Sequence, residues 1–235
     1  MTILAIESSS ATAGTALVRD RKIIAEYSLD NKMTHSQTLL PMIDHIMKMA
    51  ECRPEELDAI AVSSGPGSYT GLRIGAATAK GLGLSLKIPV IPVPTLMSLS
   101  YSSWAPGFLV SPLLDARRGH VYTALYRQTD TIPETVKEPC CVPFTEWADL
   151  LHGMKEPVIL TGDVLGLYRA FIREHADLIP APAHQMAPRA AAAAVLGDMF
   201  FEKGIYVPAG EFVPDYMKLS QAERVREEKL STDAL

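Results

Sequence analysis

Two polar turns carry residue types that could hold a phosphate group. The first contains Glu7, Ser8, Ser9 and Ser10, and the second contains Gly65, Gly67, Ser68 and Thr70. Hydroxyl and backbone N–H groups at such turns can surround an anion, and the second turn leads into a predicted helix whose N-terminus favours negative charge. It is not a Walker A loop, because no Gly-Lys-Ser/Thr follows the glycines. Serine and glycine are also ordinary turn residues, so a purely structural role stays open for both turns.

The elements that would position these turns are strands and helices in alternation. Short apolar runs predict strands at 3–6, 13–19, 22–29, 57–63 and 89–93. Apolar periodicity predicts helices from about 35 to 50 and from about 70 to 86, and a short helix begins at Thr95. Each polar turn therefore follows a predicted strand.

The same kind of pattern restarts after Trp104. We predict strands at 108–114, 120–126 and 158–161, and helices at 144–153, 165–176 and 188–203. The chain is thus expected to be an α/β protein with two lobes, each a mixed sheet flanked by helices. The expected boundaries are 1–103, 104–220 and a charged tail at 221–235. The long C-terminal helix could pack on either lobe.

Two predicted helices have faces suited to close packing. On the first, an apolar stripe is widened by Leu40 and Met47, which suggests burial on two sides. On the second, small residues recur at every fourth position and form a ridge that another helix could approach closely. The predicted partner or dimer interface contains His35, Leu39, Met42, Ile43, Ile46, Gly71, Gly75, Ala79 and Gly83. The alternative is that both helices only cover the sheet of their own lobe.

Composition excludes several classes of protein. Of 235 residues 48% are hydrophobic, and the formal net charge is −5, without the clustered Lys and Arg that nucleic-acid binding by the chain alone would need. The three cysteines form neither a disulfide framework nor a CxxC pattern. No apolar stretch reaches the length of about 18 residues expected of a membrane span, and no signal peptide is recognisable. We therefore expect a cytoplasmic protein that does not enter a membrane.

The two polar turns and the segments around them, taken together and in their order along the chain, are specific enough to indicate a family. The segments LAIESSS and GTALV, then HSQTLLPMI, then SSGPGSYTGLRIGAATAKGLGLSLKIPVIPV resemble the actin-like, hexokinase-like ATPase superfamily. Within it the chain resembles the TsaB (YeaZ) family over nearly the whole first lobe. The likeness is looser in the second half, through LDARRGHVY and PDYMK. The resemblance implies two lobes of actin-like, ribonuclease-H-like topology.

The related catalytic family, TsaD, carries a His-x-x-x-His metal pair at a place where this chain has Thr95 and Leu99. Such spacing puts two imidazoles on one helix face, and leucine cannot ligate a metal. The scattered histidines and Cys140-Cys141 do not rebuild a site, so we predict no metal site and no catalytic residues. Glu7 stands where many superfamily ATPases have an aspartate that organises Mg²⁺. Weak or interface binding of ATP or ADP therefore stays open, with no cofactor required.

The resemblance implies a non-catalytic scaffold subunit in the formation of tRNA N6-threonylcarbamoyladenosine. Its expected partners are TsaD, in a heterodimer, and TsaE through that complex. The chain alone would form a homodimer, and it would meet tRNA only within the complex. The alternative is an enzyme of the same superfamily, either a nucleotide-binding phosphotransferase or a metallopeptidase-like protein.

Overall fold

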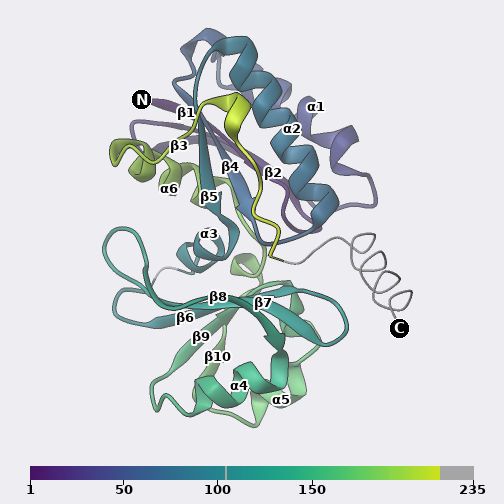
Figure 1. Cartoon of the computed structure of the whole chain (residues 1–235), viewed down its shortest axis with the longest axis vertical. Coiled ribbons are helices and arrows are strands. Elements are labelled where there is room, and N and C mark those ends of the chain that lie inside the picture. The colour runs from purple at the N-terminus through teal and green to yellow at the C-terminus, as the bar shows by residue number, and fades with distance from the viewer. Residues whose placement is uncertain (104, 218–235) are drawn as a thin grey trace, which may run out of the picture.

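The protein consists of two lobes, each built on a five-stranded sheet (Figure 1). The computed structural model describes residues 1–103 and 105–217. The predicted tail at 221–235, and Lys218 of the PDYMK motif, lie outside the described residues. Among the described helices, none is long and apolar enough to cross a membrane.

The first sheet has the strand order β3-β2-β1-β4-β5. Its strands are β1 (Thr2–Glu7), β2 (Ala13–Arg19), β3 (Lys22–Leu29), β4 (Ala59–Gly65) and β5 (Val90–Pro94). The first three form an antiparallel meander, and β4 runs parallel to β1 with Ile6 opposite Val62. Because β1 and β4 are parallel neighbours, the two polar turns that follow them lie at the same edge of the sheet.

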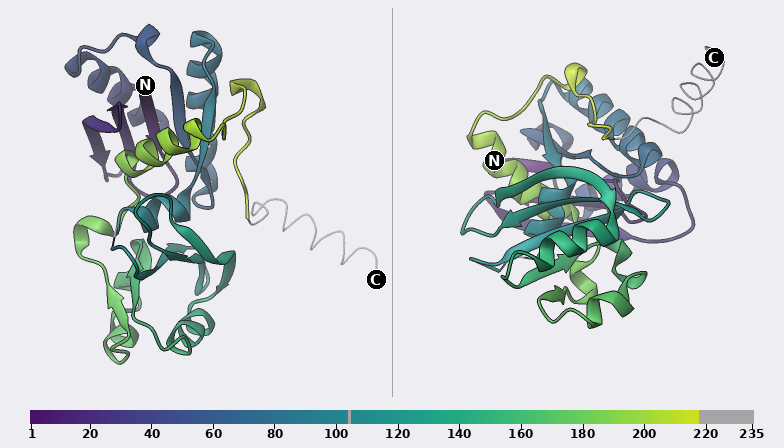
Figure 2. Two further views of the ribbon diagram at one scale, coloured as in Figure 1. Left: turned by 90° about the vertical axis from the view of Figure 1, so that its left-hand side faces the viewer. Right: turned by 60° about the horizontal axis from the view of Figure 1, so that its bottom comes forward.

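Helices cover both faces of this sheet. The helices α1 (His35–Met49) and α2 (Tyr69–Leu86) lie on one face, and α6 (Ala190–Glu202) lies across the other (Figures 1 and 2). Successive side chains of β1 point to opposite faces of the sheet and so enter two separate hydrophobic cores. Leu4 and Ile6 face α1 and α2, while Ile3 and Ala5 face α6. The C-terminal helix, whose lobe the sequence left open, therefore belongs to the first sheet.

The second sheet has the order β10-β9-β6-β7-β8. Its strands are β6 (Leu109–Asp115), β7 (His120–Arg127), β8 (Glu134–Pro143), β9 (Val158–Thr161) and β10 (Leu178–Pro180). The helices here are α4 (Phe144–His152) and α5 (Arg169–Arg173), and α3 (Thr95–Tyr101) packs between the lobes. Short 3-10 helices occupy Pro54–Glu56, Asp163–Gly166, Ala183–Gln185 and Ala209–Glu211.

Two features of the second lobe differ from the prediction. Strands β8 and β10 were not expected, and the helix predicted at 165–176 is only a 3-10 turn followed by the five residues of α5. The core here depends on aromatic side chains: Phe144 stacks on Tyr168 with ring centroids 3.6 Å apart. Trp147 Nε1 donates a hydrogen bond to Ser111 Oγ at 2.8 Å, which fixes α4 to the sheet.

After α6 the chain returns across the first lobe. Val207 forms a β-bridge with Val90, and Lys80 Nζ of α2 donates to the Phe212 carbonyl at 3.1 Å. Further on, the Asp215 N–H donates to the Ser64 carbonyl at 2.7 Å. This returning segment therefore reaches the second polar turn.

Candidate functional site

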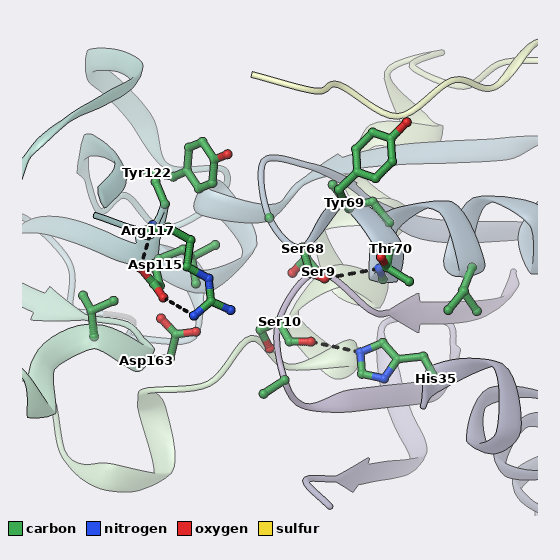
Figure 3. Close-up of a pocket in the computed structure, with 18 of the residues that line it drawn as sticks. Ser9, Ser10, His35, Ser68, Tyr69, Thr70, Asp115, Arg117, Tyr122 and Asp163 are labelled. Carbon is green, nitrogen blue, oxygen red and sulfur yellow. Dashed lines mark hydrogen bonds and ion pairs between the residues drawn. The ribbon is translucent and has the colours of Figure 1, made fainter. Parts of the chain in front are cut away.

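A cleft between the two lobes forms a cavity of about 940 Å³. Both polar turns line one wall, and Figure 3 shows residues of the second lobe facing them from the other side. The residues that matter for its chemistry are Ser9, Ser10, His35, Ser68, Thr70, Asp115, Arg117, Asp163 and Asp215. The prediction placed the two turns at strand ends, and the structure brings them into contact.

The two turns are joined by hydrogen bonds. The Ser68 N–H donates to the Ser9 carbonyl at 2.7 Å, and a Cβ on Gly67 would lie less than 3.0 Å from the same carbonyl. His35 at the start of α1 holds the other side of the first turn, with Nε2 and the Ser10 carbonyl 2.9 Å apart. Glycine at position 67 is therefore required by the close approach of one turn to the other.

The small-residue ridge of α2 faces its own lobe. A Cβ on Gly71 would lie less than 3.0 Å from the Ser8 carbonyl, and one on Gly75 equally close to Ser8 Oγ. Gly83 lies against Ala209, and Ala79 is fully buried. Contact of these four residues with a partner helix stays a prediction. The close packing that their small size permits is with the first turn and the returning segment.

The apolar stripe of α1 is also internal. Leu39, Met42, Ile43 and Ile46 are buried against β1, β2 and β4 in the core of the first lobe. The sequence predicted these four residues as interface. In this chain they cover their own sheet, which is the alternative that the sequence left open. Other large apolar side chains of α1 and α2 are exposed: Leu40 at 55% and Met49 at 69% on α1, and Leu84 at 60% on α2.

Glu7 organises the first turn from within. Its carboxylate is fully buried and accepts hydrogen bonds from the Ser9 N–H at 2.7 Å, from Ser9 Oγ and from Ser63 Oγ. Burial raises the pKa of Glu7, although these hydrogen bonds act in the opposite direction. A carboxylate committed to three internal donors orients the turn instead of facing the cleft.

The opposite wall carries charged residues that the prediction did not include as a site. The Arg117 guanidinium pairs with the Asp115 carboxylate at 3.0 Å within the β6–β7 turn, and the backbone N–H of Arg117 donates to the same carboxylate at 2.7 Å. Asp163 lies beside them, and desolvation by the surrounding protein raises its pKa, as does the nearby charge of Asp115. The LDARRG motif marked this turn in the sequence, but no local signal pointed to Asp163.

Several backbone N–H groups of the two polar turns, which the resemblance linked to nucleotide phosphates, are already engaged within the protein. The N–H groups of Ser9 and Ser68 are engaged with Glu7 and the Ser9 carbonyl, and the Gly71 N–H donates to Ser68 Oγ at 3.3 Å. Among the described residues that line the cavity, Asp115, Asp163 and Asp215 are accompanied by one arginine, Arg117, which is paired with Asp115. Such a wall disfavours a polyanion.

The structure also describes the positions that match the metal pair of the catalytic family. Thr95 and Leu99 are both fully buried on α3, where Leu99 packs with Leu96 and Leu114. Within the described ranges 1–103 and 105–217, no three His, Cys, Asp or Glu side chains are grouped to hold a metal ion.

Comparisons with known proteins agree with this architecture. A family model described as "tRNA N6-adenosine threonylcarbamoyltransferase" (TsaD) matches residues 22–222. The "tRNA threonylcarbamoyladenosine biosynthesis protein TsaB" of Bacillus subtilis (strain 168) is 37% identical over 95% of this chain and 96% of its own. Two solved Pseudomonas aeruginosa structures share the fold. One, described as an uncharacterized protein with similarity to peptidase YEAZ, has a TM-score of 0.81 and 24% sequence identity to this chain. The other, YeaZ, has a TM-score of 0.77 and 23% sequence identity. Each covers 92% of this chain and 99% of its own.

The fold and the cleft define a two-lobed α/β protein with a five-stranded mixed sheet flanked by helices in each lobe, as the sequence predicted. The chain belongs to the TsaB (YeaZ) family, a relationship that the identity over 95% of its length establishes.

Proposed function

We propose that this chain is a non-catalytic subunit of the machinery that forms tRNA N6-threonylcarbamoyladenosine. The observation that carries the proposal is the likeness, over nearly the whole of both chains, to a Bacillus subtilis protein named for threonylcarbamoyladenosine biosynthesis. The formal net charge of this chain is −5, which supports a role in which a partner holds the tRNA. The proposed location is the cytoplasm, where tRNA modification would take place.

The absence of an active site is part of the proposal. Thr95 and Leu99 supply no imidazole, and the buried carboxylate of Glu7 is occupied by Ser9 and Ser63. Because the N–H groups of Ser9, Ser68 and Gly71 are already engaged, the proposal is that the chain requires no cofactor and that ATP or ADP binds only weakly or at an interface with a partner. Tight Mg²⁺-dependent ATP binding by the chain alone would instead support the phosphotransferase alternative.

The proposed partner is a TsaD-type subunit, with a TsaE-type ATPase joining through that pair. Because the predicted interface residues other than His35 are buried in the first lobe, we assign the contact to the outward faces of α1 and α2, which lie side by side. Leu40 on α1 and Leu84 on α2 are large apolar side chains more than half exposed there. The same surface would pair two copies when the partner is absent, since a self-complementary patch suits two-fold symmetry.

The experiment is reconstitution of the modification with purified components. We expect threonylcarbamoyladenosine on tRNA when this chain is present with its TsaD and TsaE counterparts, and none from this chain alone. Leu40→Glu and Leu84→Glu should prevent complex formation, because burying an unpaired carboxylate at an interface is costly. Val136→Glu on β8 is the matched control, since Val136 is also an exposed apolar residue but lies in the second lobe.

Each outcome separates the parts of the proposal. Product formed at an equal rate without this chain would refute its role in the reaction. A complex that forms equally well with all three variants would refute the assignment to α1 and α2. Product made by this chain alone would refute its non-catalytic nature.

A further inference from the structure

Two histidines lie side by side on the surface of the second lobe, away from the cleft. His152 is the last residue of α4, and His175 follows α5. Their ring centroids are 5.3 Å apart and the ring planes are inclined by 82°. The side chain of His152 is 61% exposed, so ions in solution can reach it.

Each imidazole is held through its Nδ1 atom. His152 Nδ1 lies 3.0 Å from the Asp177 carboxylate, and His175 Nδ1 lies 2.9 Å from the Phe171 carbonyl. Both partners are acceptors, so each Nδ1 carries a proton, and in the neutral form of the ring the lone pair is on Nε2. This is the arrangement of metal-binding histidines, whose other ring N–H is usually donated to a carboxylate or a backbone carbonyl. Phe171 also stacks on His175 at 4.2 Å, which limits the rotation of that ring.

The separation of the rings suits a shared ion. A Zn–N distance of about 2.0–2.1 Å and a tetrahedral angle place the centres of two imidazoles about 5 Å apart. The observed 5.3 Å agrees with that separation. Imidazole is a ligand that Zn²⁺ and other borderline divalent cations prefer.

We propose that Nε2 of His152 and Nε2 of His175 form a surface site for one divalent transition-metal ion such as Zn²⁺. Asp177 and the Phe171 carbonyl orient the two ligands. Since no three candidate ligand side chains are grouped anywhere in the described part of the chain, water completes the coordination. A bound ion would join the end of α4 to the segment that follows α5, and so stiffen the outer edge of the second lobe.

The test is calorimetric titration of the full chain with ZnCl₂, in a Cys140→Ser/Cys141→Ser background because free thiols also bind zinc. We expect one ion per chain. His152→Gln and His175→Gln should each weaken binding at least tenfold, and Asp177→Asn should weaken it about tenfold through the orientation of His152. His184→Gln, which changes another histidine of the same lobe, should leave the affinity unchanged.

Far-UV circular dichroism shows whether each variant is folded, and ring-proton NMR of the unsubstituted histidines gives a second readout. Zinc should shift or broaden the His152 and His175 signals before those of the other histidines. The proposal is overturned if the background protein does not bind zinc, if either ligand variant binds as tightly as that protein, or if His184→Gln loses affinity equally. It does not depend on the proposed function.

Discussion

Replacing Gly75 by alanine tests whether the first polar turn is seated on α2. A Cβ at this position would lie less than 3.0 Å from Ser8 Oγ and 3.3 Å from Ser8 Cβ. Alanine gains about 1 kcal/mol over glycine in a helix. Overpacking of a filled interior costs about 1–3 kcal/mol. We therefore expect Gly75→Ala to lower the free energy of unfolding by up to about 2 kcal/mol.

A second substitution shows whether the clash with Ser8 is the cause. Ser8 Oγ is buried and has no hydrogen-bond partner among the described residues, so Ser8→Ala alone should cost little. Combined with Gly75→Ala it removes the clashing oxygen, and the two changes should couple by about 1–3 kcal/mol. The matched control is Gly81→Ala on the same helix, where a Cβ meets nothing within 4 Å and should stabilise by about 1 kcal/mol.

Urea denaturation followed by circular dichroism measures all four variants. If Gly75→Ala stabilised the protein as much as Gly81→Ala, the turn would not be seated on the helix. If Ser8→Ala did not rescue Gly75→Ala, the cost would arise elsewhere. A folded Gly75→Ala variant that failed only in complex formation would restore the original interface prediction for this ridge.

Three further substitutions test other parts of the account by urea denaturation. Burial raises the pKa of Glu7 above its ordinary value of 4.5, so the protonated carboxyl group contributes stability below pH 4.5 that is lost as pH rises from there through the folded-state pKa. Glu7→Gln should remove that loss, and pH profiles of stability that run parallel for the two proteins would contradict it. Trp147→Phe should cost about 1–3 kcal/mol because the buried hydrogen bond to Ser111 disappears, whereas an unchanged midpoint would argue against that bond. Glu26→Ala should cost about 2 kcal/mol, since Glu26 pairs with Arg189 and accepts the backbone N–H at the start of α6; a cost near zero would mean that this helix start is capped by solvent.

The sequence predicted the first lobe well because its signals are strong and local. The strand expected at 3–6 is β1 at Thr2–Glu7, and the helix expected from about 35 to 50 is α1 at His35–Met49. Strand β8 was missed because it is an exposed edge strand with charged residues and Pro139, so it lacks the alternation of apolar residues on which the prediction rests.

The site was harder to predict than the fold. The recurrence of Gly71, Gly75 and Gly83 predicts the close approach of another helix, but the spacing cannot say which element approaches. Here it is the Ser8–Ser9 turn and the returning segment, brought there by the pairing of β1 with β4 and of Val90 with Val207. Contacts of this kind depend on residues far apart in the chain, which local periodicity does not report.

The central claim, that the chain acts as a partner subunit, is tested most directly by size-exclusion chromatography with light scattering. The chain would be measured alone and mixed with its TsaD-type counterpart. The account predicts a new stoichiometric heterodimer peak that Leu40→Glu abolishes and Val136→Glu preserves. Two independent peaks at micromolar concentrations, with no complex in any mixture, would contradict it.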